Sequence, residues 1–146
     1  MNDTSVQDIR ETVVSNHSFG PQEIRQLCKI ISDDYSQLAV LKDAVGELSQ
    51  VEDRSPAQAV RLGVCQYLVG KFSEAQDTLS HADGGALAQY YLAKTYFQLS
   101  NNEAALEHFA AAKTAGYDVD QCNVATAEVK RYQGKLLLGH GFLQCR

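Results

Sequence analysis

Apolar residues recur along most of this chain at the spacing of amphipathic helices. The first clear segment has them at i, i+3, i+4 and i+7, in the order Ile24, Leu27, Cys28 and Ile31. Pro21 precedes this segment and suits a first helical turn, where the missing N–H of proline costs nothing. A second segment carries Leu38, Leu41, Val45 and Leu48. No stretch has the pattern of a strand, so the sequence predicts an all-α chain of helices joined by short turns.

The strongest local signal lies at Ser55, Pro56 and Gln58. Ser55 suits an N-cap, Pro56 suits the first helical position, and Gln58 completes a capping box. A helix is therefore predicted to begin near Pro56. Beyond it, turn-forming residues separate apolar segments of helical length: Gly70, Gly84–Gly85, Asn101–Asn102, Gly116 and Gly134.

The chain is expected to consist of an N-terminal tail followed by one helical domain. Residues 1–18 are mostly polar and are predicted to form an N-terminal tail or a short, loosely held helix. Residues 19–146 are predicted to form one domain of antiparallel helix pairs, the first of which is a diverged cap. The four pairs span approximately residues 21–50, 56–83, 86–114 and 119–146.

Small and large residues recur at matching positions in these helix pairs. The first copy contains Leu62, Gly63, Gly70, Phe72, Ala75, Leu79 and Ala82. The second contains Leu92, Ala93, Tyr96, Ala105, Phe109 and Ala112, and a weaker third contains Ala127, Gly134, Leu136, Gly139 and Leu143. Small residues allow antiparallel helices to cross closely, while the large residues fill the spaces between repeats.

These positions resemble the tetratricopeptide pattern, W-x2-L-G-x2-Y followed by A-x3-F, over roughly residues 56–146. The resemblance implies a short right-handed α-solenoid that binds peptides or proteins on its concave face. Further stretches are Phe19–Arg25, Asp43–Leu48, Asp53–Ala57, Arg61–Cys65, Ala82–Leu87 and Ala115–Asp118. They are similar to the amino-terminal region of a bacterial family that joins such repeats to a domain like the carboxy-terminal domain of the RNA polymerase alpha subunit. The sequence contains no counterpart of that last domain.

In tetratricopeptide stacks, residues at i, i+4 and i+7 of the first helix of each pair line the concave face. The resemblance thus predicts partner binding at Val60, Val64, Tyr67, Tyr90, Lys94, Phe97, Glu128 and Arg131, with Val124 beside them. Aromatic rings next to a lysine suit an extended or helical peptide with apolar anchors and a carboxylate. The alternative is that Tyr90 and Phe97 are packing residues that contact the next helix.

Composition narrows the classes of function. The 146 residues are 45% hydrophobic and 21% charged, with a net charge of -5. This is a globular composition, and an acidic chain lacks the basic footprint for direct binding of nucleic acid. No apolar run approaches the length that spans a bilayer, and the first residues lack the features of a secretory signal. We expect a cytoplasmic protein whose partners are proteins or peptides.

Residues with reactive side chains are scattered rather than clustered. The cysteines are Cys28, Cys65, Cys122 and Cys145, and the histidines are His17, His81, His108 and His140. Neither set has the spacing of a metal site or redox dithiol, so we expect buried reduced thiols, no metal and no cofactor. Asp118 or Asp120 is expected to cap a helix rather than to act as a catalytic acid. The sequence therefore predicts a non-enzymatic interaction scaffold.

The carboxy-terminal residues are unusually apolar for the end of a repeat stack, which normally carries a polar cap. This predicts self-association through Leu136, Leu137, Phe142 and Leu143. Two alternatives to a peptide-binding scaffold follow: a self-assembling structural module, or a fragment of a larger transcription-associated tetratricopeptide protein.

Overall fold

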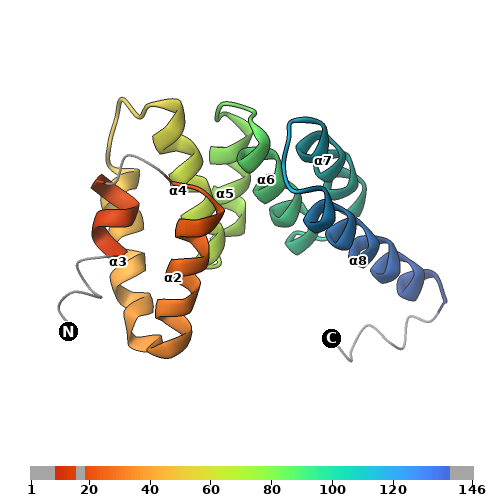
Figure 1. Cartoon of the computed structure of the whole chain (residues 1–146), viewed down its shortest axis with the longest axis horizontal. Helices are drawn as coiled ribbons and strands as arrows, with labels where there is room; N and C mark the ends of the chain where they lie inside the picture. Colours follow the sequence, from red (N-terminus) through yellow and green to blue (C-terminus); the bar gives the residue numbers. More distant parts are fainter. Residues whose placement is uncertain (1–8, 16–18, 139–146) are drawn as a thin grey trace. The chain divides into compact units, whose positions relative to one another are not determined.

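The computed structural model describes residues 9–15 and 19–138, and every regular element within those ranges is helical (Figure 1). Stacked helices follow one another through short turns, so the all-α prediction is confirmed for this part of the chain. The elements are η1 (Glu11–Ser15), α2 (Pro21–Asp33), η2 (Tyr35–Gln37), α3 (Leu38–Ser49), α4 (Pro56–Leu68), α5 (Phe72–Ser80), α6 (Ala86–Gln98), α7 (Asn102–Thr114) and α8 (Val119–Leu138).

The chain divides into two compact units. The first ends at Asp83 and the second begins at Gly84. The first therefore contains η1 to α5, and the second contains α6 to α8. None of the helices in the described ranges combines the length and apolar character that crossing a bilayer requires.

The helix starts follow from local side-chain chemistry. Ser55 Oγ accepts a hydrogen bond from the Gln58 backbone N–H at 3.1 Å, and Gln58 Oε1 accepts one from the Ser55 N–H at 2.9 Å. This confirms the predicted capping box, whose loss costs a helix about 1 kcal/mol. Asp118 Oδ1 accepts from the backbone N–H of Gln121 at 3.1 Å, so Asp118 is the capping aspartate before α8.

The turns after α4, α6 and α7 each contain a residue in the left-handed region. Gly70, after α4, has φ 88°, and Gly116, after α7, has φ 107°. Only glycine adopts this region without steric cost. Ser100 has the same role after α6, with φ 67°, and bears that cost.

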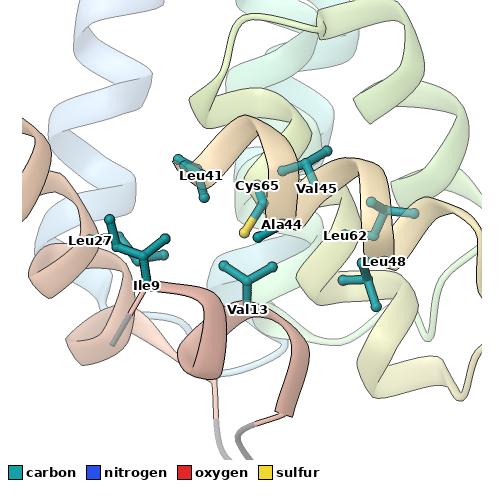
Figure 2. Close-up of a cluster of buried hydrophobic side chains, with 9 residues drawn as sticks. All are labelled: Ile9, Val13, Leu27, Leu41, Ala44, Val45, Leu48, Leu62 and Cys65. Atoms are coloured by element: carbon teal, nitrogen blue, oxygen red, sulfur yellow. The ribbon is translucent and has the colours of Figure 1, made fainter. Parts of the chain in front are cut away.

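Within the N-terminal segment that was predicted as a tail or a short, loosely held helix, residues 9–15 are helical. The segment carries the π-helical turn η1, and the side chains of Ile9 and Val13 are completely buried. Both belong to the apolar core of the first unit. Figure 2 shows them with the other members of that core, which are Leu27, Leu41, Ala44, Val45, Leu48, Leu62 and Cys65.

Helices α4 and α5 of the first unit cross closely at Gly63. A Cβ added to Gly63 would lie 2.5 Å from Cδ2 and from Cγ of Leu79, which is 2% exposed. Ala75 is also completely buried. The small residues that the repeat pattern singled out therefore lie where two helices meet without room for larger side chains.

In the second unit, α6 and α7 form a helix hairpin, and α8 packs on α7. Ala93, Ala105 and Ala112 are completely buried, which is the same use of small residues at a helix crossing. Within residues 119–134 of α8, the buried side chains are those of Cys122 and Val129, two turns apart on one face. Together they close the apolar core of the second unit.

The predicted fourth helix pair, residues 119–146, is described only as far as Leu138, and the described part is a single helix. Helix α8 continues through Gly134 to Leu138 instead of turning there. Ala127 is exposed, although the repeat pattern predicted a close approach at this position. A glycine inside a helix costs only about 1 kcal/mol, so packing of the rest of α8 can outweigh it. Gly139 and Leu143 lie outside the described residues.

Candidate functional site

The predicted binding residues of the first unit are mostly buried. Val60 is 7% exposed and Val64 is completely buried, both in α4. Tyr67 is half-buried, and its ring centre lies 5.5 Å from that of Phe72. Burial of this kind is typical of packing residues for Val60 and Val64, and Tyr67 packs against Phe72 of α5.

Tyr90, in α6, is a packing residue of the second unit. Its ring stacks on that of Tyr117 with the centres 4.1 Å apart and the planes 11° from parallel. Phe109 meets the same ring edge-on at 5.5 Å. Burial raises the pKa of the Tyr90 hydroxyl, and the negative charge of Glu128 acts in the same direction. Of the two alternatives for Tyr90, the structure favours core packing.

Lys94 lies one turn further along α6, at the edge of this aromatic cluster. Its Nζ is 5.5 Å from the centre of the Tyr90 ring and 5.7 Å from that of Tyr91. A cation over the face of a ring gains roughly 0.5–1 kcal/mol. The half-buried Lys94 is therefore held over the aromatic cluster, where it adds a positive charge beside apolar rings.

Phe97, near the end of α6, meets Tyr132 of α8. The ring centres are 5.6 Å apart and the planes are 88° from parallel, an edge-to-face contact. Both side chains are half-buried, so part of each ring faces solvent. The repeat pattern did not single out Tyr132, although it follows Cys122 and Val129 at helical spacing along the inward face of α8.

The outward face of α8 carries three residues at i, i+4 and i+7. Val124 is 69% exposed, and Glu128 and Arg131 are exposed. Neither charged side chain forms an ion pair with a described residue. We call the following set the α6–α8 surface: Lys94, Phe97, Val124, Glu128, Arg131 and Tyr132.

Outside the α6–α8 surface, the placement of titratable side chains bears on metal binding and on cysteine reactivity. Among the described residues, no group of three or more His, Cys, Asp or Glu side chains is placed to hold a metal ion. Burial raises the pKa of Cys65 to about 12, so this thiol stays protonated at neutral pH and is a poor nucleophile. Cys122 is also buried, as expected, but Cys28 is exposed, which corrects the expectation for that residue. Cys145 lies outside the described residues.

The predicted self-association face lies beyond the described side chains. Leu136 and Leu137 belong to the last turn of α8, where only the helix itself is described. Phe142 and Leu143 lie outside the described residues. Self-association through this face stays a prediction.

Comparison with protein-family models, curated proteins and solved structures finds no match to this chain. Its function is therefore inferred from the residues and geometry above.

Proposed function

We propose that this chain is a non-enzymatic interaction scaffold of the tetratricopeptide type, which binds a peptide segment of a partner protein on the α6–α8 surface. Support for the repeat comes from two helix hairpins, α4–α5 and α6–α7, with buried small residues at matching positions. These are Gly63 and Ala75 in the first hairpin, and Ala93 and Ala105 in the second. The cytoplasmic location predicted from the sequence is part of this proposal.

The observation that carries the proposal is the partly exposed pair of rings from Phe97 and Tyr132, with cations on both helices. Lys94 precedes Phe97 by three residues on α6, and Arg131 is the neighbour of Tyr132 on α8. Aromatic side chains and arginine are the residue types that contribute most to binding energy at protein interfaces. The α6–α8 surface thus combines an apolar anchor point with charges that suit a carboxylate.

The chemistry of the surface limits its partner. An apolar side chain of the peptide would cover the exposed edges of the two rings, and a nearby acidic group would approach Arg131. Glu128, one turn before Arg131, would repel a second acidic group placed toward the start of α8. The partner we propose is a short segment with an apolar anchor and a single carboxylate close to it.

A random peptide library displayed on phage tests this proposal even though the partner is unidentified. We expect enriched peptides to contain an apolar residue close to an acidic one. Their affinity should fall about tenfold or more in Phe97→Ala and in Arg131→Glu, the scale of a loss of ~1.4 kcal/mol. Lys42→Glu is the matched control, because it makes the same charge reversal on an exposed residue of α3.

Three results would count against the proposal. Enrichment could fail altogether, or the enriched peptides could bind equally well to both surface variants and the wild type. Equal losses in Lys42→Glu and Arg131→Glu would also contradict it, because binding would then follow net charge rather than the α6–α8 surface.

A further inference from the structure

The two helix hairpins of the chain bury small residues at the same relative positions. In the first hairpin, Gly63 of α4 lies against Leu79 of α5, and Ala75 of α5 is completely buried. In the second, Ala93 of α6 and Ala105 of α7 are both completely buried. In each hairpin the buried small residue of the second helix follows that of the first by twelve residues. The second helix thus covers the same position of the first helix in both hairpins.

The contacts between α6 and α7 define the rest of the face that a second helix covers. Gln89 and Tyr96 lie about one turn to either side of Ala93. Nδ1 of His108, in α7, lies 2.7 Å from Gln89 Oε1. The ring of His108 also stacks on that of Tyr96, with the ring centres 5.2 Å apart. Residues 89, 93 and 96 of α6 therefore all belong to the face that meets α7.

Helix α8 presents the same three positions, but no described helix covers them. Ala127 corresponds to Ala93, and Asn123 and Lys130 correspond to the residues on either side of it. All three are exposed, although Asn123 accepts a hydrogen bond from Lys113 of α7. We call Asn123, Ala127 and Lys130 the open face of α8. It has no residue in common with the α6–α8 surface.

The sequence that follows α8 repeats the pattern of the two second helices. Gly139 comes twelve residues after Ala127, as Ala105 comes after Ala93. Leu143 then follows Gly139 by four residues, which is the spacing between the small and the large residue of α5 and of α7. Residues 139–146 therefore carry the side chains that suit the open face.

Helix α8 does not turn where the earlier first helices end. Gly70 and Ser100 follow those helices with φ 88° and 67°. Gly134 has the corresponding place after Ala127, but it lies inside α8, which continues to Leu138. At 1.5 Å per residue, the end of α8 lies about 16 Å beyond Ala127. While α8 is straight, Gly139 of the same chain cannot reach the open face, whereas Gly139 of an antiparallel second copy can.

We propose that residues 139–146 of a second copy of this chain bind the open face of α8, so that two chains exchange this segment in a dimer. Gly139 of each copy would lie opposite Ala127 of the other, with the two-fold axis near Gly134. Exchange of an identical element between two copies reuses the contacts that a hairpin makes within one chain. The dimer uses no residue of the α6–α8 surface, so it is separate from peptide binding there.

A pair of introduced cysteines tests this pairing directly. Ala127→Cys and Gly139→Cys are combined in a chain in which Cys28 and Cys145 are replaced by serine to remove competing thiols. After mild oxidation, a non-reducing gel should show a disulfide-linked dimer of twice the 16.0 kDa chain mass. A disulfide within one chain, which leaves a monomer, would overturn the proposal, and so would the absence of a disulfide. Gln121→Cys in place of Ala127→Cys is the control and should give little dimer, because Gln121 is exposed on another side of α8.

Light scattering over a concentration series measures the dimer of the unmodified chain. Ala127→Glu places a charge on the open face and should weaken the dimer at least tenfold, while Gln121→Glu adds the same charge elsewhere on α8 and should not. Gly134→Ala should strengthen the dimer at least threefold. Alanine favours a continuous α8, and a Cβ added at Gly134 meets nothing within 4 Å. A mass of 16.0 kDa at every concentration, or equal weakening by both glutamate variants, contradicts the proposal.

Phe97→Ala distinguishes failure of this proposal from failure of the peptide-binding proposal. This variant should weaken peptide binding and leave the mass of the dimer unchanged, whereas Ala127→Glu should do the reverse. Circular dichroism checks that the variants are folded. If Ala127→Glu does not fold, the result of the cysteine pair decides.

Discussion

Replacement of Gly63 by alanine tests how closely α4 and α5 approach each other. The added Cβ would lie 2.5 Å from both Cγ and Cδ2 of Leu79, whereas ordinary van der Waals contacts begin at 3.4 Å. Because Cγ is close to the backbone, Leu79 cannot relieve this contact by moving only its tip. It is also 2% exposed, so there is no open space into which it can turn. Either α5 shifts or Leu79 adopts a strained rotamer.

Two effects of the substitution oppose each other. Alanine is better than glycine in a helix by about 1 kcal/mol. Overpacking a well-filled core costs about 1–3 kcal/mol, and a contact this short belongs at the upper end. We therefore expect Gly63→Ala to lower the free energy of unfolding by roughly 1–2 kcal/mol.

Gly46 provides a matched control within the same unit. It is exposed in α3, and a Cβ added there would meet nothing within 4 Å. Gly46→Ala makes the same chemical change without the clash, so it should raise the stability by roughly 0.5–1 kcal/mol. The two substitutions are thus expected to have opposite signs.

Urea unfolding followed by far-UV circular dichroism measures both effects. With a slope of about 1–3 kcal/mol/M, Gly63→Ala should lower the unfolding midpoint by roughly 0.5–1 M. Adding Leu79→Ala should remove the clash, so the double variant should be more stable than the sum of the single losses indicates. If Gly63→Ala is stabilised to the same degree as Gly46→Ala, α4 and α5 do not approach at Gly63.

Three further predictions follow from the helix ends and from a half-buried histidine. Ser100→Gly should raise the melting temperature by a few degrees in calorimetry, because φ 67° costs serine about 1 kcal/mol; an unchanged or lower value contradicts the strain. Ser55→Ala should lower the free energy of unfolding in urea by about 1 kcal/mol by removing the capping box, and no loss would show that this cap is dispensable. Burial lowers the pKa of His108, whose Nδ1 lies 2.7 Å from Gln89 Oε1, so the folded state resists its protonation. Stability should therefore fall as the pH drops below about 6.5, and the melting temperature of His108→Gln should depend less on pH in that range.

Local chemistry explains why much of the fold was predictable. The capping box at Ser55 requires only residues three apart, and the left-handed turns at Gly70 and Gly116 require only glycine. The close approach at Gly63 followed from the repeated spacing of small residues. Each of these features is determined by neighbours in the sequence or by a repeated pattern.

The features that sequence reasoning missed depend on distant packing. Ile9 and Val13 have only a weak helical spacing, and their burial depends on partners in α2, α3 and α4. The burial of Tyr90 depends on Tyr117, which lies beyond the end of α7. Gly134 has the local character of a helix breaker, yet α8 passes through it.

Part of the candidate site was predictable because it depends only on local helical spacing. The spacing of Lys94 and Phe97 on α6, and of Glu128 and Arg131 on α8, follows from helical periodicity alone. The contact of Phe97 with Tyr132 joins two helices through the packing of the second unit, and no local pattern specifies it.

NMR mapping of an enriched peptide on the isotopically labelled chain locates the proposed binding site residue by residue. On titration, the largest chemical-shift changes should belong to residues of the α6–α8 surface and their immediate neighbours. Phe97→Ala should reduce these changes at the same peptide concentration. If the largest changes belong to residues of α3, α5 or α7, with none on α6 or α8, the proposal that this surface binds the partner is contradicted.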